Sequence, residues 1–259
     1  AGLSRVEDLV SYVKMSGFDS LAVTDHGAMY GAIKFYKEAK EAGIKPIIGV
    51  ETYVATRSRI DKQPGVDKDQ YHLVLLAKDE TGYKNLLQLV TQAHLTGYYY
   101  KPRIDLDLLK KHSKGLICLS GCLAGEVATL IQNDGIEKAE LKVREYAEIF
   151  GQDNYYLELQ IHPAIRVQER VNTELVRISR KLGIPIVATN DAHYLRPEDA
   201  EAHEVLLCVQ TQHTLLERNR PLSMADSPDF YLRSEREMKE LFVQYPDAIA
   251  NTRKIAAMC

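Results

Sequence analysis

The sequence lacks any apolar run that approaches the roughly 18 residues that a membrane-spanning helix needs. No signal peptide opens the chain either. Cysteine is scarce, and the four cysteines at positions 118, 122, 208 and 259 form no disulfide framework for a chain of 259 residues. Together these absences predict reduced thiols, no membrane contact and a cytoplasmic location.

A strong excess of either charge is also missing. The chain has 33 Lys and Arg against 36 Asp and Glu, which gives a formal charge of −3. This balance argues against a general basic coat for nucleic acid, although it leaves room for a local basic cleft. Hydrophobic residues make up 45% and charged residues 27%, as in ordinary globular proteins. The length suits one large α/β domain, or one domain with an appendage.

Segments typical of strands alternate with segments typical of helices over most of the chain. The expected strands are residues 20–24, 47–54, 71–77, 116–120, 155–160 and 184–189. The expected helices are residues 6–15, 30–42, 80–94, 136–150 and 165–182, with Gly43 as a C-cap of the second. The alternation predicts a βα barrel or an open doubly wound sheet. Because a helix opens the chain, either the barrel is incomplete or a first strand lies upstream.

The character of the sequence changes after Leu195. Helical patterns cover residues 197–209, 235–244 and 247–258, and residues 230–232 could form a short strand. We therefore divide the chain into a barrel domain of residues 1–196 and a helical extension of residues 197–259.

Three apolar strands end in side chains that bind metals. His26 follows the first, Glu51 ends the second, and Asp191 and His193 follow the last. If the last strand continues, Asp191 and His193 point the same way. We therefore expect a parallel barrel with one divalent metal centre in a cleft at one end. A buried Glu51 must be paired or metal-bound, whereas His26 could instead cap a helix.

Four further residues are weaker candidates. Cys122 follows a strand in a Ser-Gly-Cys loop, and it is either a small buried hydrophobe or a soft metal donor. His72 lies at the start of its strand, away from the expected metal end, so the residues alone indicate a structural role. Glu158 and His162 flank the end of the strand at 155–160 and are reserve candidates.

The segment at 98–103 joins three tyrosines to two cations. It follows a helix and precedes another, so we expect a mobile loop beside the cleft. Tyr99, Lys101 and Arg103 could stack on bases and hold phosphates of a nucleic acid. The same segment could equally be a packed loop whose tyrosines cover the barrel.

Six motifs in order make nearly the whole chain resemble the polymerase-and-histidinol-phosphatase (PHP) domain, as found at the N-terminus of bacterial DNA polymerase III alpha subunits. They are AVTDHG at 22–27, KPIIGVE at 45–51, YHLVLL at 71–76, YYKPRID at 99–105, LSGC at 119–122 and ATNDAHY at 188–194. The tail from FYLRS at 230–234 is similar to the segment that leads into the polymerase core.

The resemblance implies a distorted (β/α)7 barrel of PHP type with up to three divalent metal ions. Its implied ligands are His26, Glu51, His72, Cys122, Asp191 and His193, so that His72 becomes a ligand. Zinc suits these mixed N, O and S donors, with Mn²⁺ or Mg²⁺ as alternatives. The family's first strand, with a His-x-His motif, would lie upstream of Ala1, and Ala1 replaces a family Asp. We therefore expect partial metal occupancy, or none, in this chain.

The activity implied by the resemblance is a metal-dependent phosphoesterase, a 3′–5′ exonuclease when complete, with Glu51, Asp191 and His193 as catalytic residues. Its implied partners are DNA, the rest of the polymerase chain and other holoenzyme subunits. The chain has no polymerase carboxylates and could not polymerise alone. Two alternatives are a partner-binding module with a decayed metal site and a free-standing phosphatase of the histidinol-phosphate type. The six retained ligands argue against decay, and the tail and the 99–105 motif argue against the phosphatase.

Overall fold

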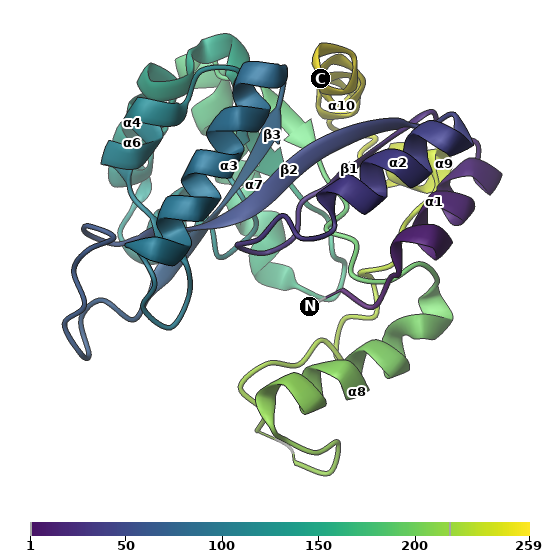
Figure 1. Cartoon of the computed structure of the whole chain (residues 1–259). Helices are drawn as coiled ribbons and strands as arrows, with labels where there is room; N and C mark the ends of the chain where they lie inside the picture. Colours follow the sequence, from purple (N-terminus) through teal and green to yellow (C-terminus); the bar gives the residue numbers. More distant parts are fainter. Residues whose placement is uncertain (1, 218) are drawn as a thin grey trace.

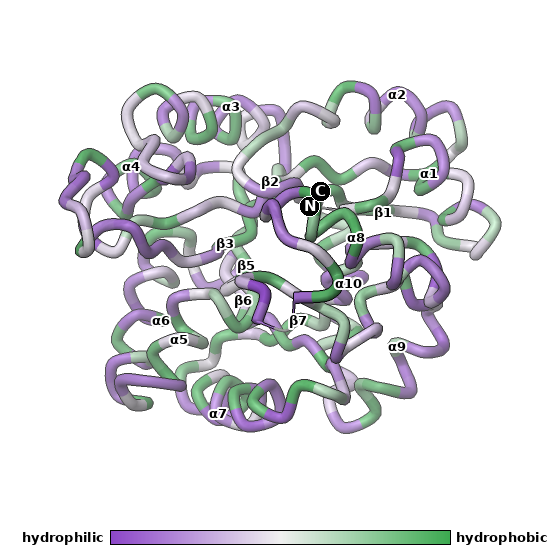
Figure 2. Tube along the Cα trace, turned by 90° about the horizontal axis from the view of Figure 1, so that it is seen from below, coloured by the Kyte–Doolittle hydropathy of each residue, from purple (hydrophilic) through white to green (hydrophobic). Residues whose placement is uncertain are grey.

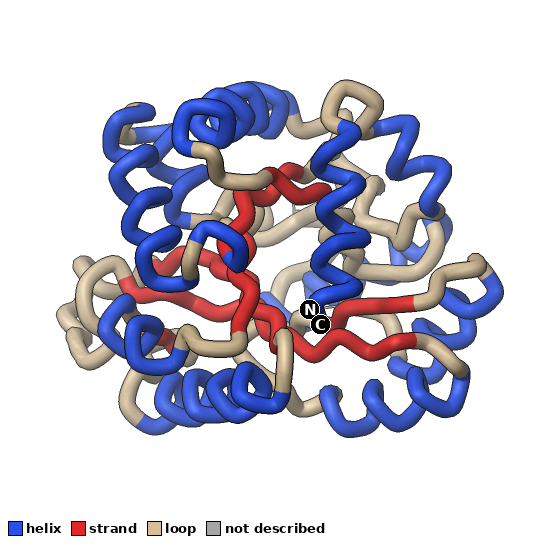
Figure 3. The backbone as a smooth tube through the Cα atoms, turned by 90° about the horizontal axis from the view of Figure 1, so that it is seen from above, coloured by secondary structure: helices blue, strands red, loops and turns tan. Residues whose placement is uncertain are grey.

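The computed structural model describes residues 2–217 and 219–259, and it shows one curled sheet surrounded by helices (Figures 1 and 3). The expectation about Ala1 therefore lies outside the described residues. The strands are β1 (Ser20–Val23), β2 (Lys45–Ala55), β3 (Gln70–Ala77), β4 (Arg103–Ile104), β5 (Leu116–Leu119), β6 (Tyr155–Leu159) and β7 (Ile186–Ala188). Their order is β1-β2-β3-β5-β6-β7, and β4 pairs with β2 outside this path. The predicted distorted α/β barrel is confirmed, and β4 is the one described strand that was not predicted.

The expectation that all strands run parallel is wrong at β3. Strand β2 runs parallel to β1 and β4, and β6 runs parallel to β5 and β7, but β3 is antiparallel to both β2 and β5. The segment between β2 and β3 has no crossover helix. Parallel neighbours need such a crossover, whereas antiparallel neighbours can be joined by a loop. The polar residues at 56–70 are typical of a loop, so the sequence already indicated that no helix joins these two strands.

Ten α-helices of the described residues surround or extend the sheet. They are α1 (Val6–Met15), α2 (Ala32–Ala42), α3 (Glu80–Leu95), α4 (Leu106–His112), α5 (Glu126–Asn133), α6 (Ile136–Phe150), α7 (Arg166–Leu182), α8 (Ala200–Thr211), α9 (Glu235–Leu241) and α10 (Pro246–Met258). Hydrophobic and hydrophilic residues alternate around the turns of peripheral helices such as α7 (Figure 2). In α7, Val171, Leu175 and Ile178 are buried at spacings of four and three, so one face packs on the core. Gly43 ends α2 in the left-handed conformation, as predicted.

Helix α10 packs against the inner side of the curled sheet. Ile255 joins an apolar cluster with residues of five strands, among them Val74 of β3 and Tyr156 of β6. Asn251 Nδ2 and Thr252 Oγ1 donate hydrogen bonds to the carbonyls of Ile186 and Ala188 in β7, at 2.8 and 3.1 Å. The helix therefore satisfies carbonyl groups of β7, one of the two end strands of the sheet.

The rest of the tail is less closely packed on the sheet. Helix α8 extends away from the body of the molecule (Figure 1). The strand expected at 230–232 is reduced to a single bridge between Tyr194 and Tyr231. Among the described residues, none of the helices is both long and apolar enough to cross a bilayer.

Candidate metal centre

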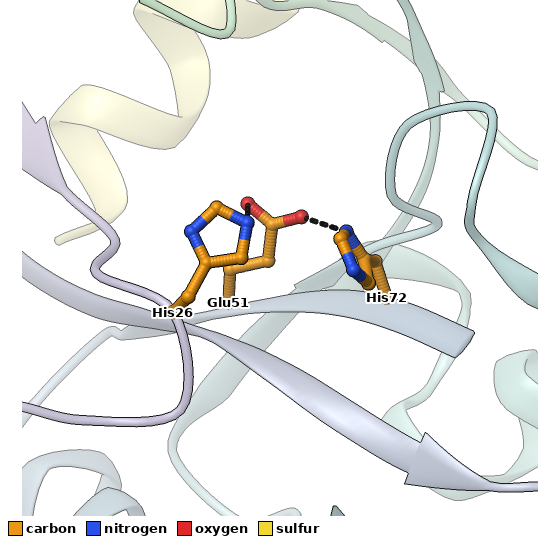
Figure 4. A group of neighbouring side chains, drawn as sticks. All are labelled: His26, Glu51 and His72. Atoms are coloured by element: carbon orange, nitrogen blue, oxygen red, sulfur yellow. Dashed lines mark ion pairs between the residues drawn. The ribbon is translucent and has the colours of Figure 1, made fainter. Parts of the chain in front are cut away.

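Three strands bring His26, Glu51 and His72 together (Figure 4). His26 follows β1 and forms a bridge with Glu51 of β2. His72 of β3 pairs with Tyr53 of β2, and Tyr53 shares a sheet face with Glu51 two residues earlier. The potential ligand atoms of His26, Glu51 and His72 all lie within 4.8 Å of one another. His72 therefore lies in this group, not apart from it as its place at the start of a strand suggested.

The Glu51 carboxylate lies between the two imidazoles. Its Oε1 is 2.6 Å from His72 Nδ1, and its Oε2 is 3.6 Å from His26 Nε2. Glu51 is buried, with 7% of its surface exposed. Burial lowers the pKa of His26, against the opposing effect of the Glu51 charge. A neutral imidazole keeps a free lone pair, which is the form that binds a metal.

Cys122 lies beside this group on the loop after β5. Its Sγ is 3.6 Å from His72 Nδ1. The His72 N–H donates to the carbonyl of Ala124 at 3.0 Å, so the loop is tied to β3. Burial raises the pKa of the Cys122 thiol well above its usual value, and the charges of Glu51 and Asp191 add to the effect. A cation at this position would reverse that electrostatic effect and favour the thiolate.

Asp191 and His193 approach the same region from the loop after β7. Asp191 Oδ1 is 3.4 Å from His193 Nε2, and the His193 and His26 rings are 6.3 Å apart. Burial works to raise the pKa of Asp191, but the hydrogen bond and charge of His193, together with His162 and His26, lower it below the usual value. Strand β7 ends at Ala188, and Asp191 has a positive φ of 51°. A turn therefore brings the two side chains together, not the strand alternation that we expected.

The reserve candidates Glu158 and His162 are both buried near these loops. Burial raises the pKa of Glu158 to about 7, and the charges of Glu51 and Asp191 act in the same direction. The His162 ring stacks on Phe230 with centroids 4.2 Å apart. Neither ring nitrogen has a hydrogen-bond partner within residues 2–217 and 219–259, and burial lowers the pKa of His162 to about 4.

Tyr53 contributes to the centre, although sequence reasoning missed it. Its ring centroid lies 5.4 Å from that of His72 and 6.1 Å from that of His26. Burial raises the pKa of Tyr53 to about 12, and the Glu51 charge contributes. The available signal was its position two residues after Glu51, which places both on one face of β2.

The aromatic and basic segment at 98–103 touches the centre through Lys101. Lys101 Nζ lies 5.5 Å from the centroid of the Tyr53 ring. Tyr98 and Tyr100 are exposed, whereas Tyr99 is half-buried, with its ring 5.2 Å from the Arg103 guanidinium. Segment 98–103 thus lies beside the candidate ligands, as expected.

Arg103 does not face a possible nucleic acid. It is fully buried. Its guanidinium donates to the carbonyls of Gly97, Asp67, Arg59 and Asp61, at distances of 2.7 to 3.1 Å. The geometry argues against the phosphate-binding role expected for Arg103, because its donors hold the loop at 56–69 instead.

Comparisons with known proteins agree with the motifs. The family described as "PHP domain" matches residues 1–162. The chain is 47% identical over its whole length to the DNA polymerase III subunit alpha of Borreliella burgdorferi, and 44% identical to that of Thermus aquaticus. It covers 22% and 21% of those proteins, so it spans about a fifth of the length of the relatives that it matches.

A solved structure also resembles the chain over most of its length. It is a putative metal-dependent phosphoesterase from Bifidobacterium adolescentis, with 11% identity and a TM-score of 0.46. The superposition covers 94% of this chain and 92% of that one.

Proposed function

Because the chain belongs to the PHP domain family, we propose that it is the metal-dependent phosphoesterase region of a DNA polymerase III alpha subunit. In this proposal it removes nucleotides from DNA 3′ ends when its metal site is complete. The observation that carries the proposal is the convergence of His26, Glu51 and His72 within 4.8 Å. Its implied partners are DNA, the rest of a longer polymerase chain and other replication subunits, and its implied location is the cytoplasm.

The donor set fits a divalent metal. Two imidazoles and a buried carboxylate form the group, and a thiol lies 3.6 Å from one imidazole. Mixed N, O and S donors favour Zn²⁺, with Mn²⁺ or Mg²⁺ as alternatives. Bound divalent ions would supply the positive charge that activates water and stabilises charge on a phosphate group. A buried carboxylate between two histidines supports this assignment, because burying a charge without a partner costs several kcal/mol.

The chain's own residues have distinct roles in this proposal. Glu51 orients His26 and His72 and provides the negative charge that attracts a cation between them. Asp191 remains ionised at neutral pH because its pKa is lowered, so that it and His193 supply a second pair of ligands.

A single strand of DNA would reach the centre past the 98–103 segment. Lys101 can neutralise a phosphate beside Tyr53. The exposed rings of Tyr98 and Tyr100 can stack on bases, and Tyr99, between them in the chain, is half-buried. Arg103 has no role in this proposal, because its guanidinium already donates hydrogen bonds to four backbone carbonyls inside the protein.

Metal titration of the protein and of two histidine variants tests the centre. We expect His72→Ala to weaken Zn²⁺ or Co²⁺ binding by about tenfold or more. His213→Ala is the matched control, because His213 forms an exposed ion pair with Glu217. Equal metal affinity in the parent and in His72→Ala would contradict the proposal.

Hydrolysis of 3′-labelled single-stranded DNA by the longer polymerase chain tests the activity. We expect metal-dependent release of 3′ nucleotides that His72→Ala abolishes and His213→Ala retains. Metal binding without any hydrolysis would instead favour a structural or partner-binding module.

A further inference from the structure

Glu158 connects two loops that carry candidate metal ligands. It is the penultimate residue of β6, and β6 lies between β5 and β7 in the sheet. Its Oε2 accepts a hydrogen bond from the Gly121 N–H at 3.2 Å, and its Oε1 accepts one from Thr189 Oγ1 at 2.5 Å. Gly121 immediately precedes Cys122, and Thr189 lies two residues before Asp191. One carboxylate therefore bonds to both loops.

The Glu158 side chain is itself held in place. Gln160 Nε2 donates to Glu158 Oε1 at 2.9 Å. Asn172 Nδ2, from α7, donates to the Gln160 carbonyl at 2.7 Å, and Gln168 Nε2 donates to Asn172 Oδ1 at 3.0 Å. The backbone of Glu158 also donates to Ser120 Oγ at 2.9 Å. These buried bonds join Glu158 to a helix and to the end of β5, so its carboxylate has little freedom to follow either loop.

We propose that Glu158 is a positioning residue that couples the Cys122 loop to the Asp191 loop and so fixes the separation of their ligand atoms. The proposal rests on the proposed metal centre only for the purpose of the coupling, which is to hold the metal ligands at a fixed separation. The coupling itself depends on hydrogen bonds that need no metal. Outer partners of this kind typically affect metal affinity by about 10- to 100-fold.

The electrostatics of the site support a role beyond packing. Glu158 is 4% exposed and interacts unfavourably with the charges of Glu51 and Asp191. A buried carboxylate beside two others is a poor choice for stability alone. A cation bound among the candidate ligands would relieve that repulsion.

Hydrogen exchange in metal-free protein tests the coupling directly. With Glu158→Ala we expect amide exchange to accelerate by about tenfold in both residues 119–125 and residues 189–193, because both loops lose their hydrogen bond to the buried Glu158 carboxyl group. Glu158→Gln should stay close to the parent in both loops, because its amide oxygen can accept from the Gly121 N–H while its Nε2 donates to Thr189 Oγ1 and to a turned Gln160 amide oxygen. Faster exchange in only one loop, or in neither, would overturn the proposal.

Glu204→Ala is the matched control. Glu204 is also a buried carboxylate, but it accepts bonds from Ser223 Oγ and the Met224 N–H. Its loss should accelerate exchange in residues 219–225 and leave both ligand loops unchanged. If Glu204→Ala accelerates the ligand loops as much as Glu158→Ala does, the effect is general loosening and the proposal fails.

Thr189→Val keeps the experiment decisive if Glu158→Ala does not fold. This variant removes one donor and leaves the carboxylate held by Gln160 and bonded to Gly121, so the proposal predicts faster exchange in residues 189–193 and unchanged exchange in residues 119–125. Unchanged exchange in residues 189–193, or equal acceleration in both loops, would contradict the proposal.

Cobalt binding gives a second readout. The absorption band from thiolate to Co²⁺ reports the Cys122 bond. It should fall by about half or more in Glu158→Ala with about tenfold weaker binding, and Glu158→Gln should restore it. An unchanged band in a folded Glu158→Ala would overturn the link to the metal centre. If the parent itself binds no Co²⁺, the proposed function fails, while the exchange data still decide the coupling.

Discussion

His72 of β3 pairs with Tyr53 of β2 in an antiparallel ladder, and its Nδ1 lies 2.6 Å from Glu51 Oε1. The start of β3 therefore lies beside the end of β2. In a barrel of parallel strands, a residue at a strand start would lie at the opposite end from the other ligands. Reversal of this one strand lets four consecutive strand ends of the sheet, β1, β2, β3 and β5, contribute to one centre.

Replacing Asp191 with Asn should abolish hydrolysis and preserve the fold. The backbone at Asp191 has a φ of 51°, and Asn tolerates this conformation better than most residues. Asn also keeps one oxygen, but it loses the charge that binds a cation. We expect an unchanged thermal midpoint and no release of 3′ nucleotides from labelled single-stranded DNA.

Asp191→Ala should differ from Asp191→Asn in its effect on stability. It should lose activity and also stability, by about 1 kcal/mol, because Ala disfavours a positive φ. Activity unchanged in Asp191→Asn would point to a contaminant or to another site.

Replacing the two cations of the 98–103 segment should affect two different properties of the protein, DNA binding for Lys101 and stability for Arg103. Lys101→Ala should weaken binding of single-stranded DNA and reduce the salt slope by about 0.7, with no change in stability. Arg103→Ala should destabilise the protein by at least roughly 3 kcal/mol, because four buried carbonyls lose their donor.

Fluorescence anisotropy across salt concentrations and chemical denaturation separate these effects. A Lys101→Ala variant that binds DNA as the parent does but unfolds more easily would show that Lys101 only packs on Tyr53. A fully stable Arg103→Ala variant would show that the hydrogen bonds of Arg103 to the four backbone carbonyls do not stabilise the protein.

Much of the site could be predicted from the sequence because its ligands follow apolar strands. His26 and Cys122 lie just after strand ends, and periodicity identifies such ends well. Glu51, expected to end its strand, lies inside β2, because β2 continues to Ala55. Strand direction is less visible, since the same apolar run fits a parallel or an antiparallel neighbour. The position of His72 at the start of its strand therefore separated it from the group that it joins, and only the motif resemblance placed it there.

Arg103 shows the other limit of sequence reasoning. A basic residue beside three tyrosines has the composition of a nucleic-acid contact, yet its hydrogen-bond partners are the backbone carbonyls of residues 59, 61, 67 and 97. Those contacts come from a distant loop whose path no local pattern predicts. Asp191 is similar, because its position results from a left-handed turn and not from the strand period.

The loop at 56–69 should loosen at low pH. The pKa of Asp67 is lowered from 3.8 to about 2, chiefly by its hydrogen bonds with Arg57, whose Nε and Nη2 lie 2.8 and 2.7 Å from its carboxylate. Because the folded pKa is below the unfolded value, this pair stabilises the protein above about pH 4. The stabilisation is lost as the pH falls through about 2.

Hydrogen exchange of residues 56–69, corrected for intrinsic rates, measures this change. We expect protection in the parent to fall between about pH 4 and pH 2, whereas Asp67→Asn should be weakly protected at every pH. Asp8→Asn, which removes an exposed pair with Arg5, should behave as the parent does. A flat profile in the parent would show that Asp67 does not hold the loop.

Gly121, in the loop that carries Cys122, should be sensitive to substitution both for its backbone conformation and for its surroundings. Its φ is 83°, and a Cβ there would lie 2.7 Å from the His72 carbonyl oxygen. Gly17 has a similar φ of 78° but no atom within 4 Å of such a Cβ, which makes Gly17→Ala a matched control. We expect Gly17→Ala to cost about 1 kcal/mol from backbone strain alone. Gly121→Ala should cost about 3 kcal/mol, because it adds a contact with rigid backbone.

The clash also predicts an effect on metal binding that strain alone would not cause. Relief of the contact must move the Cys122 loop away from His72, which separates Sγ from Nδ1. Denaturation and Zn²⁺ titration of the two variants should therefore show weaker metal binding in Gly121→Ala only. Equal losses of stability and equal metal affinities in the two variants would mean that the loop can shift without disturbing the centre, and that Gly121 is required only for its backbone conformation.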